Sequence, residues 1–206
     1  MAESNAGTLI GMAASTMSQL RAGLMSQAES DIGESDVVSS LRNAGYAGGD
    51  AIFAAFEKWV RGAGRAGATS AGDGTEGSAG DLALTEFETR ASGFFRNAGW
   101  GEVKFSSAEG EGAAVVDIVN CWEGAAAAGE AIPACHLTTG MLAGFFGRIA
   151  GYTVAVLETE CCATGSPRCR FMMGNAEAMN YAWESMRQAG ADPRALSPLS
   201  LQSMAT

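Results

Sequence analysis

The sequence predicts an α+β fold in which a twisted antiparallel sheet of about four strands is covered by helices. Two pairs of short strand-like segments, each joined by turn residues, have the pattern of hairpins. One helical segment separates the two pairs, and further helical patterns come before the first pair and after the second. The 206 residues are enough for one such domain with its own core.

The N-terminal part of the chain is predicted to be helical. Residues 8–28 have Leu and Met at helical spacing, and a short second helix begins near Asp36 and ends at Asn43–Gly45. A third helix begins at Asp50 and has one apolar side, made of Ile52, Phe53, Phe56, Trp59 and Val60. We predict that residues 1–61 form a helical segment that packs on the core or on a second copy of the chain, which would make the protein a homodimer.

Residues 62–80 are dominated by Gly, Ala and Ser, and they predict a flexible loop. The loop contains Gly62-x-Gly64-x-x-Gly67, which has the spacing of a dinucleotide-binding fingerprint. That fingerprint requires a preceding strand, whereas this one follows a helix. The sequence therefore gives no support for a nucleotide cofactor at this place.

Residues 81–190 are predicted to form the core, and residues 191–206 a tail. The helices are expected at 81–97, 133–150 and 176–188, and the strands at 101–106, 113–122, 152–160 and 168–173. In the second strand Trp122 would share a face with Val116 and Ile118.

Composition excludes several classes of function. The chain has 13 basic and 23 acidic residues, a net charge of −10, and no basic cluster of the kind that binds nucleic acid. No segment is long and apolar enough to predict a membrane span, and the N-terminus lacks the basic region of a secretory signal. We expect a soluble cytoplasmic protein with reduced cysteines.

Four residues predict a metal site. Glu158 lies on the strand face of Val154 and Val156, where a carboxylate is costly unless it is paired or binds a cation. Cys161 follows in the turn, Cys169 lies on the returning strand, and Cys135 begins the preceding helix. Three thiolates and one carboxylate are a closed tetrahedral set suited to structural Zn²⁺.

Two other interpretations of these cysteines remain open: packed core thiols, or a disulfide or redox pair. If the ligand set is shifted within the turn, Glu160 and Cys162 are the substitutes. His136 points away from Cys135 on the helix and is predicted to support the site rather than to bind the metal. Arg168, Arg170 or backbone N–H groups should offset the negative charge.

A Cys before a Gly-containing helix, a strand ending in Glu-x-x-Cys and a Cys eight residues later resemble the 4-vinyl reductase domain. This family includes the small-molecule-binding domain of bacterial phenol-sensing activators and a bacteriochlorophyll-biosynthesis protein, and its fold is similar to that of small TRAPP tethering subunits. The resemblance covers roughly residues 90–175. It implies that Cys135, Glu158, Cys161 and Cys169 bind zinc, and that Trp122, Phe145 and Val156 line a ligand pocket.

The resemblance implies a zinc-stabilised protein that binds a hydrophobic, aromatic or tetrapyrrole-like molecule and acts through a protein partner. Because no His precedes Trp122, it implies an apolar pocket without specificity for phenol. Two alternatives are an adaptor that uses the fold for protein contacts and a participant in the reduction of a tetrapyrrole vinyl group. A filled tetrahedral site has no open position for catalysis, and no hydride-cofactor signature is present, so binding is favoured over enzymatic activity.

Overall fold

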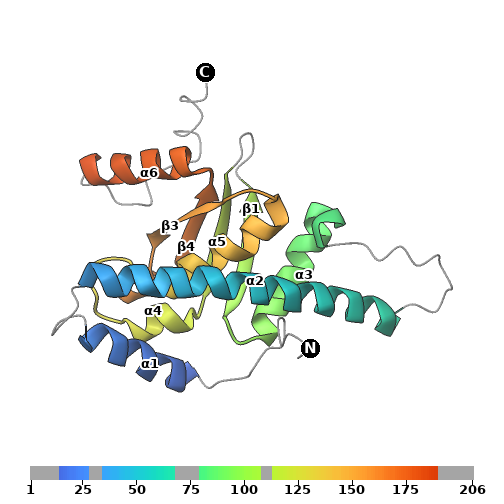
Figure 1. The fold of residues 1–206 in the computed structure, drawn as a ribbon, viewed down its shortest axis with the longest axis horizontal. Coiled ribbons are helices and arrows are strands. Elements are labelled where there is room, and N and C mark those ends of the chain that lie inside the picture. The colour runs from blue at the N-terminus through green and yellow to red at the C-terminus, as the bar shows by residue number, and fades with distance from the viewer. Residues whose placement is uncertain (1–13, 28–33, 68–78, 108–112, 190–206) are drawn as a thin grey trace, which may run out of the picture.

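The computed structural model describes residues 14–27, 34–67, 79–107 and 113–189 (Figure 1). In order, the elements are helices α1 (Ala14–Gln27) and α2 (Glu34–Gly67), a 3₁₀ turn η2 (Ala79–Asp81), α3 (Leu84–Asn97), strands β1 (Glu102–Ser107) and β2 (Ala114–Val119), α4 (Trp122–Ala126), α5 (His136–Ala150), β3 (Ala155–Glu160), a 3₁₀ turn η3 (Cys162–Thr164), β4 (Cys169–Gly174) and α6 (Ala176–Ala189). Most of the predicted loop, the acidic turn between β1 and β2, the predicted tail and the first part of the N-terminal segment lie outside the described residues.

The four strands form one antiparallel sheet in the order β1-β2-β4-β3, which confirms the predicted fold class. Alternation along the strands sends side chains to two different helical layers. Val116, Ile118 and Phe171 face the main core, which includes α5, α2 and α3. Val115 and Met172 face the other way and pack against Met179 of α6.

The main core is built largely from phenylalanine rings. Phe145 of α5 is fully buried, with its ring centroid 5.9 Å from that of Phe53, 5.5 Å from Phe56, 5.2 Å from Phe95 and 5.1 Å from Phe146. Most of these pairs are edge-to-face, the arrangement that aromatic rings prefer. Helices α2, α3 and α5 are therefore held around one aromatic cluster.

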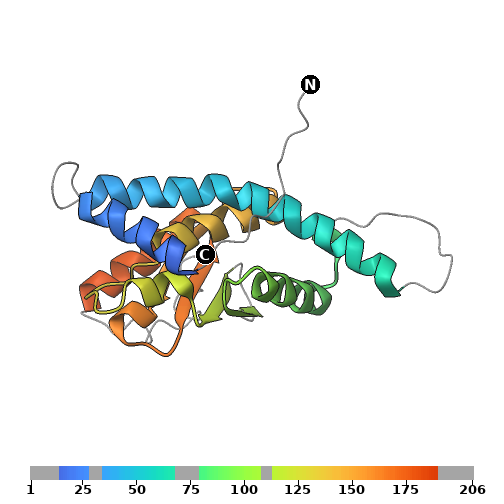
Figure 2. The same ribbon diagram turned by 90° about the horizontal axis from the view of Figure 1, so that it is seen from below.

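Helix α2 is continuous where two helices were expected, and its helical backbone continues past residue 62 to Gly67. It lies along the outer side of α5 (Figure 2). Gly45 and Gly49 of α2 face Gly140 and Gly144 of α5, and a Cβ on any of the four would collide with backbone of the opposite helix. Residues four apart lie on one helix face, so each pair forms a groove that admits the other backbone. This contact outweighs the weak helix propensity of glycine.

The second predicted strand is shorter than expected. It ends at Val119, and Asn120 then adopts a left-handed conformation with φ of 58°. Asn tolerates this conformation better than most residues, and the chain turns there into α4. Trp122 is therefore the first residue of α4 and not part of the strand, and its ring packs on Trp100 with centroids 6.2 Å apart.

Candidate metal centre and apolar cavity

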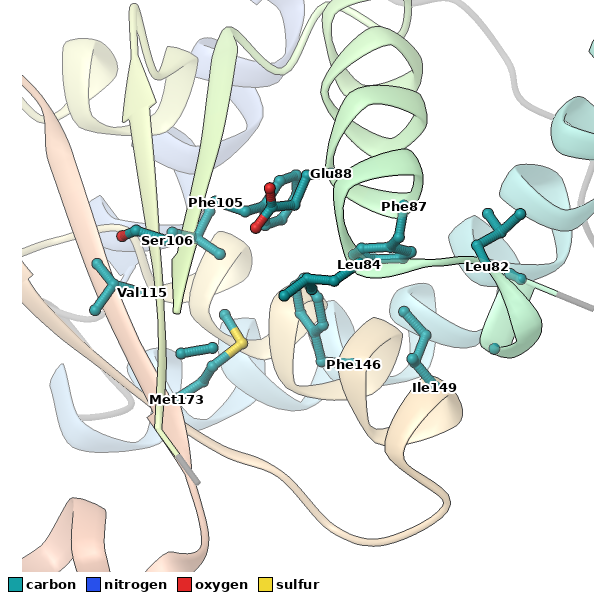
Figure 3. A pocket seen from close by; sticks show the side chains of 14 residues that line it. Leu82, Leu84, Phe87, Glu88, Phe105, Ser106, Val115, Phe146, Ile149 and Met173 are labelled. Carbon is teal, nitrogen blue, oxygen red and sulfur yellow. The ribbon is translucent and has the colours of Figure 1, made fainter. Parts of the chain in front are cut away.

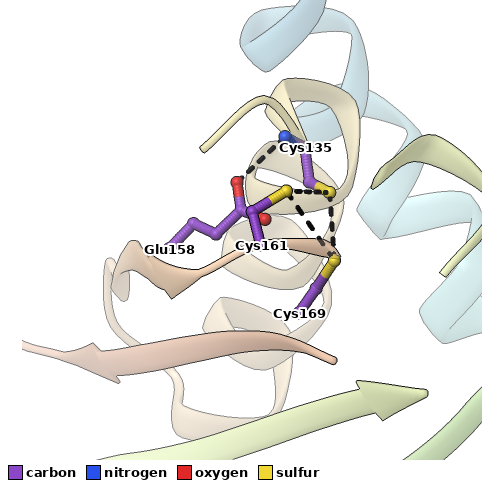
Figure 4. A group of neighbouring side chains, drawn as sticks. All are labelled: Cys135, Glu158, Cys161 and Cys169. Atoms are coloured by element: carbon purple, nitrogen blue, oxygen red, sulfur yellow. Dashed lines mark hydrogen bonds between the residues drawn. The ribbon is translucent and has the colours of Figure 1, made fainter. Parts of the chain in front are cut away.

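The four predicted metal ligands come together at the base of the β3–β4 hairpin (Figure 4). All four are buried, and one ligand atom from each lies within 4.8 Å of the others. The Cys135 sulfur lies 3.7 Å from that of Cys161 and 3.6 Å from that of Cys169, and the Cys161 and Cys169 sulfurs are 3.9 Å apart. Metal binding by this cluster stays a prediction.

Local backbone features put each ligand in place. Cys135 is the N-cap residue of α5, just before the helix rather than within its first turn. A bulge in β3 lets Glu158 and Glu160 oppose the neighbouring residues Phe171 and Arg170, so that Thr159 is an extra residue. The chain then runs through extended Cys161 into η3, which ends at Gly165 in the left-handed conformation. Cys169 begins β4.

The cluster fits a tetrahedral zinc ion. With Zn–S bonds of about 2.3 Å, the sulfurs of a tetrahedral site lie about 3.8 Å apart, close to the three measured separations. The Cys135 N–H donates to Glu158 Oε2 at 2.9 Å, whereas buried Glu158 Oε1 has no hydrogen-bond partner among the described residues. A buried carboxylate oxygen without a donor is a vacant ligand position.

Burial, and secondarily the nearby Cys161 thiolate, raises the pKa of Glu158 to about 9. The metal-free cluster therefore holds a proton on the carboxyl at neutral pH, which a bound cation would displace. The five cysteines of the chain are all described and all free. Burial lowers the pKa of neighbouring His136 to about 4, with help from Arg42 and Arg21, so its imidazole is neutral.

The two arginines of the hairpin have partners of their own. Arg170 binds both carboxylate oxygens of Asp117, at 2.7 and 2.8 Å. Arg168 and Arg170 also share Glu160 Oε1, at 3.2 and 3.3 Å. Glu160 therefore belongs to this ion-pair network on the hairpin. Close to the sulfurs, the Cys162 N–H lies 3.4 Å from the Cys169 sulfur, so a backbone donor serves the cluster.

Sequence reasoning missed a second buried carboxylate. Glu123 of α4 accepts hydrogen bonds from the backbone N–H groups of Leu137 and Thr138, at 2.9 and 2.8 Å, and from the Thr138 hydroxyl at 2.7 Å. It thus caps the N-terminus of α5, next to Cys135. Buried Arg21 of α1 lies 3.9 Å from Glu123 and donates to the Ala134 carbonyl at 3.1 Å. The only signal in the sequence is a lone Glu ahead of an alanine run.

An apolar cavity of about 320 Å³ lies between the sheet, α3 and α5 (Figure 3). Only two lining residues have polar side chains, Glu88 of α3 and Ser106 of β1. The others have apolar side chains or none: Ala79, Gly80, Leu82, Leu84, Phe87, Phe105, Ala114, Val115, Val116, Phe146, Ile149 and Met173.

The three residues predicted to line a ligand pocket are not in this cavity wall. Phe145 fills the aromatic core beside Phe146, which does line the cavity. Val156 on β3 pairs in register with Met173, another lining residue. Trp122 lies at the start of α4, against Trp100. A ligand contact by any of the three remains a prediction.

Comparison with known proteins places the fold and the family. The fold is similar to the crystal structure of the phenol-responsive sensory domain of the transcription activator PoxR with phenol, with a TM-score of 0.59 and 16% identity over 82% of this chain and 77% of that one. A vinyl-4-reductase family protein from Methanocaldococcus jannaschii aligns with a TM-score of 0.48 and 13% identity over 81% of this chain and 83% of that one. A search of curated protein sequences gave no match.

Residues 114–175 match the family model of the 4-vinyl reductase domain. This range begins at β2, ends just after β4, and contains all five cysteines together with Glu158. The resemblance to this domain that was seen in the sequence is therefore confirmed. The protein contains a 4-vinyl reductase domain at residues 114–175.

Proposed function

We propose that this protein is a sensory or carrier protein that binds a small aromatic or other hydrophobic molecule and acts through a partner protein. The observation that carries the proposal is the apolar cavity beneath the sheet. A 4-vinyl reductase domain and a fold like that of a phenol-responsive sensory domain support the same role. None of the described helices is long and apolar enough to cross a bilayer.

The size of the cavity favours a small ligand. Its volume of about 320 Å³ is near the lower limit of small-molecule sites, which span about 300–1,000 Å³. A ligand of one or two rings would fit within it, whereas a four-ring tetrapyrrole would have to project out. The Glu88 carboxylate can accept a hydrogen bond, so it favours an aromatic ring that bears a hydroxyl or amino group.

We also propose that Cys135, Glu158, Cys161 and Cys169 hold a structural zinc ion. A bound ion would tie the β3–β4 hairpin to the start of α5, whose later residues Phe146 and Ile149 line the cavity. Four protein ligands leave no open coordination position, so the ion would supply folding energy and not catalysis. The metal site and the ligand site would then be joined by one helix.

Calorimetric titration with phenol and with toluene tests the ligand site. We expect both to bind the wild-type protein, and Ala114→Phe to abolish binding because the new ring fills the cavity. Ala51→Phe is the matched control, since Ala51 is exposed on α2 and lies outside the cavity wall. Equal binding by the two variants would refute the cavity as the ligand site.

Glu88→Leu tests the role of the carboxylate. It should weaken phenol binding roughly tenfold, because a hydrogen bond to a charged acceptor contributes about 1.5–3 kcal/mol, and it should leave toluene binding unchanged. Glu86→Leu is the control, because Glu86 pairs with Arg90 on the exposed surface. If neither aromatic binds while purified protein retains a tetrapyrrole or forms a stable protein complex, the carrier or adaptor alternative replaces the aromatic sensor.

The route to a partner is proposed to pass through α1. Leu20 and Leu24 are exposed large hydrophobic residues on this helix, and α1 also supplies Arg21 to the buried Glu123. A second copy of the chain is the expected occupant, which would make the homodimer. Light scattering on wild type and on a Leu20→Glu/Leu24→Glu variant tests this: a wild-type monomer, or a dimer that the variant preserves, argues against it.

A further inference from the structure

Two cysteines outside the four proposed ligands also contact the cluster. The Cys121 sulfur lies 3.8 Å from that of Cys135, and the Cys162 sulfur lies 3.4 Å from that of Cys169. Cys121 is the N-cap residue of α4 and Cys162 begins η3, so each is placed by a turn of its own. All five thiols of the protein therefore form one continuous group of sulfurs.

Cys135 and Cys169 are at the centre of this group. Their sulfurs are 3.6 Å apart, and each also contacts Cys161. Cys121 and Cys162 contact the same central pair, through Cys135 and Cys169 respectively. The central pair thus forms an edge shared by two sets of ligands: one completed by Glu158 and Cys161, the other by Cys121 and Cys162. A thiolate sulfur has enough lone pairs to bind two ions at once.

The surroundings of the second set suit metal-bound thiolates. Gly124 packs against it so closely that a Cβ there would fall 2.5 Å from the Cys162 sulfur and 2.8 Å from that of Cys169. The Cys162 N–H lies 3.4 Å from the Cys169 sulfur, and backbone donors of this kind stabilise thiolates in metal clusters.

Charge also favours a second ion. Three thiolates and a carboxylate around one divalent ion leave an excess of two negative charges. Two more thiolates add two negative charges, which a second divalent ion cancels, so the cluster could take up both without any rise in its net charge.

We propose that Cys121 and Cys162, with Cys135 and Cys169 as bridging ligands, bind a second thiophilic divalent ion, so that this domain holds a two-zinc thiolate cluster. The proposal rests on the first zinc site proposed above. The second ion would join α4 to the hairpin, whereas the first joins the hairpin to α5.

Metal stoichiometry tests the proposal. The full chain is loaded with zinc under reducing conditions and freed of loosely bound metal, and zinc per chain is measured by elemental analysis and native mass spectrometry. We expect two ions in wild type and in the control Ser166→Ala, and one ion in the folded double variant Cys121→Ser/Cys162→Ser. The cadmium-113 spectrum of the wild type should show two coupled resonances, because bridging sulfurs connect the two nuclei.

The outcomes separate the two zinc proposals. One zinc ion in wild type, with a single cadmium resonance, overturns the second site and leaves the first intact. No zinc in wild type overturns both. Two ions in the double variant also overturn the inference, because Cys121 and Cys162 would then be unnecessary. A disulfide between either of them and a central cysteine, seen as a loss of two mass units in fully reducing buffer, would likewise replace the metal interpretation.

Discussion

Replacing Gly49 by Ala should destabilise the protein, although alanine is the better helix former. The new Cβ would lie 2.6 Å from the Met141 carbonyl oxygen and 2.7 Å from the Phe145 nitrogen, where ordinary contact begins at 3.4 Å. Backbone atoms cannot rotate away, so α2 and α5 must separate by about 0.8 Å, a gap that forfeits roughly a quarter to a half of the dispersion energy of the affected contacts.

The size of the effect follows from two opposing contributions. Overpacking of this kind costs about 1–3 kcal/mol, and the gain in helix propensity returns about 1 kcal/mol. We therefore expect the free energy of unfolding to fall by about 1–2 kcal/mol in Gly49→Ala. The neighbouring Gly48 has nothing within 4 Å of its Cβ position, so Gly48→Ala should gain about 0.5–1 kcal/mol instead.

Urea unfolding followed by far-ultraviolet circular dichroism measures both variants, at equal zinc loading. Opposite signs at two adjacent residues would be hard to produce by any general effect of alanine. If Gly49→Ala proved as stable as Gly48→Ala, the close backbone contact between α2 and α5 would not exist in solution, and the account of the fold given above would fail.

The remaining predictions concern the metal centre and its histidine. Cys169→Ala should lose its bound zinc and unfold several kcal/mol more easily, since metal binding in such sites is coupled to folding; full zinc occupancy with an unchanged melting temperature would contradict the ligand assignment. A chelator should lower the melting temperature of wild type, and added zinc should restore it. His136 has its pKa lowered from 6.5 to about 4 in the folded state, so the unfolded chain takes up about one more proton between these values and stability should fall as pH falls from 6.5 to 4. In His136→Gln this dependence should flatten, and an unchanged pH slope of the unfolding free energy would show that other groups cause it.

The sequence was sufficient for what depends on local pattern. Glu158, Cys161 and Cys169 lie on a short hairpin, so strand alternation and spacing alone predicted that they would converge. The antiparallel sheet followed from the two hairpins in the same way. Cys121 and Cys162 escaped notice because their contacts depend on α4, an element too short to show a helical period.

What the sequence could not predict depends on contacts between distant segments. The continuity of α2 is decided by α5, which lies far along the chain and fills the grooves made by Gly45 and Gly49. Glu123 caps a helix that begins after it, and its partner Arg21 comes from the opposite end of the chain. The path after β2 turns on one residue, Asn120, whose positive φ redirected Trp122 from the predicted strand into α4.

The glycine contact between α2 and α5 also determines how movement would spread through the molecule. Side chains at a helix interface absorb small displacements by changing rotamer, but facing backbones have no such slack. Helix α5 starts beside the sulfur cluster and carries Phe146 and Ile149 to the cavity. A shift of α5 caused at either place would therefore drag the 34-residue α2 with it as a rigid lever.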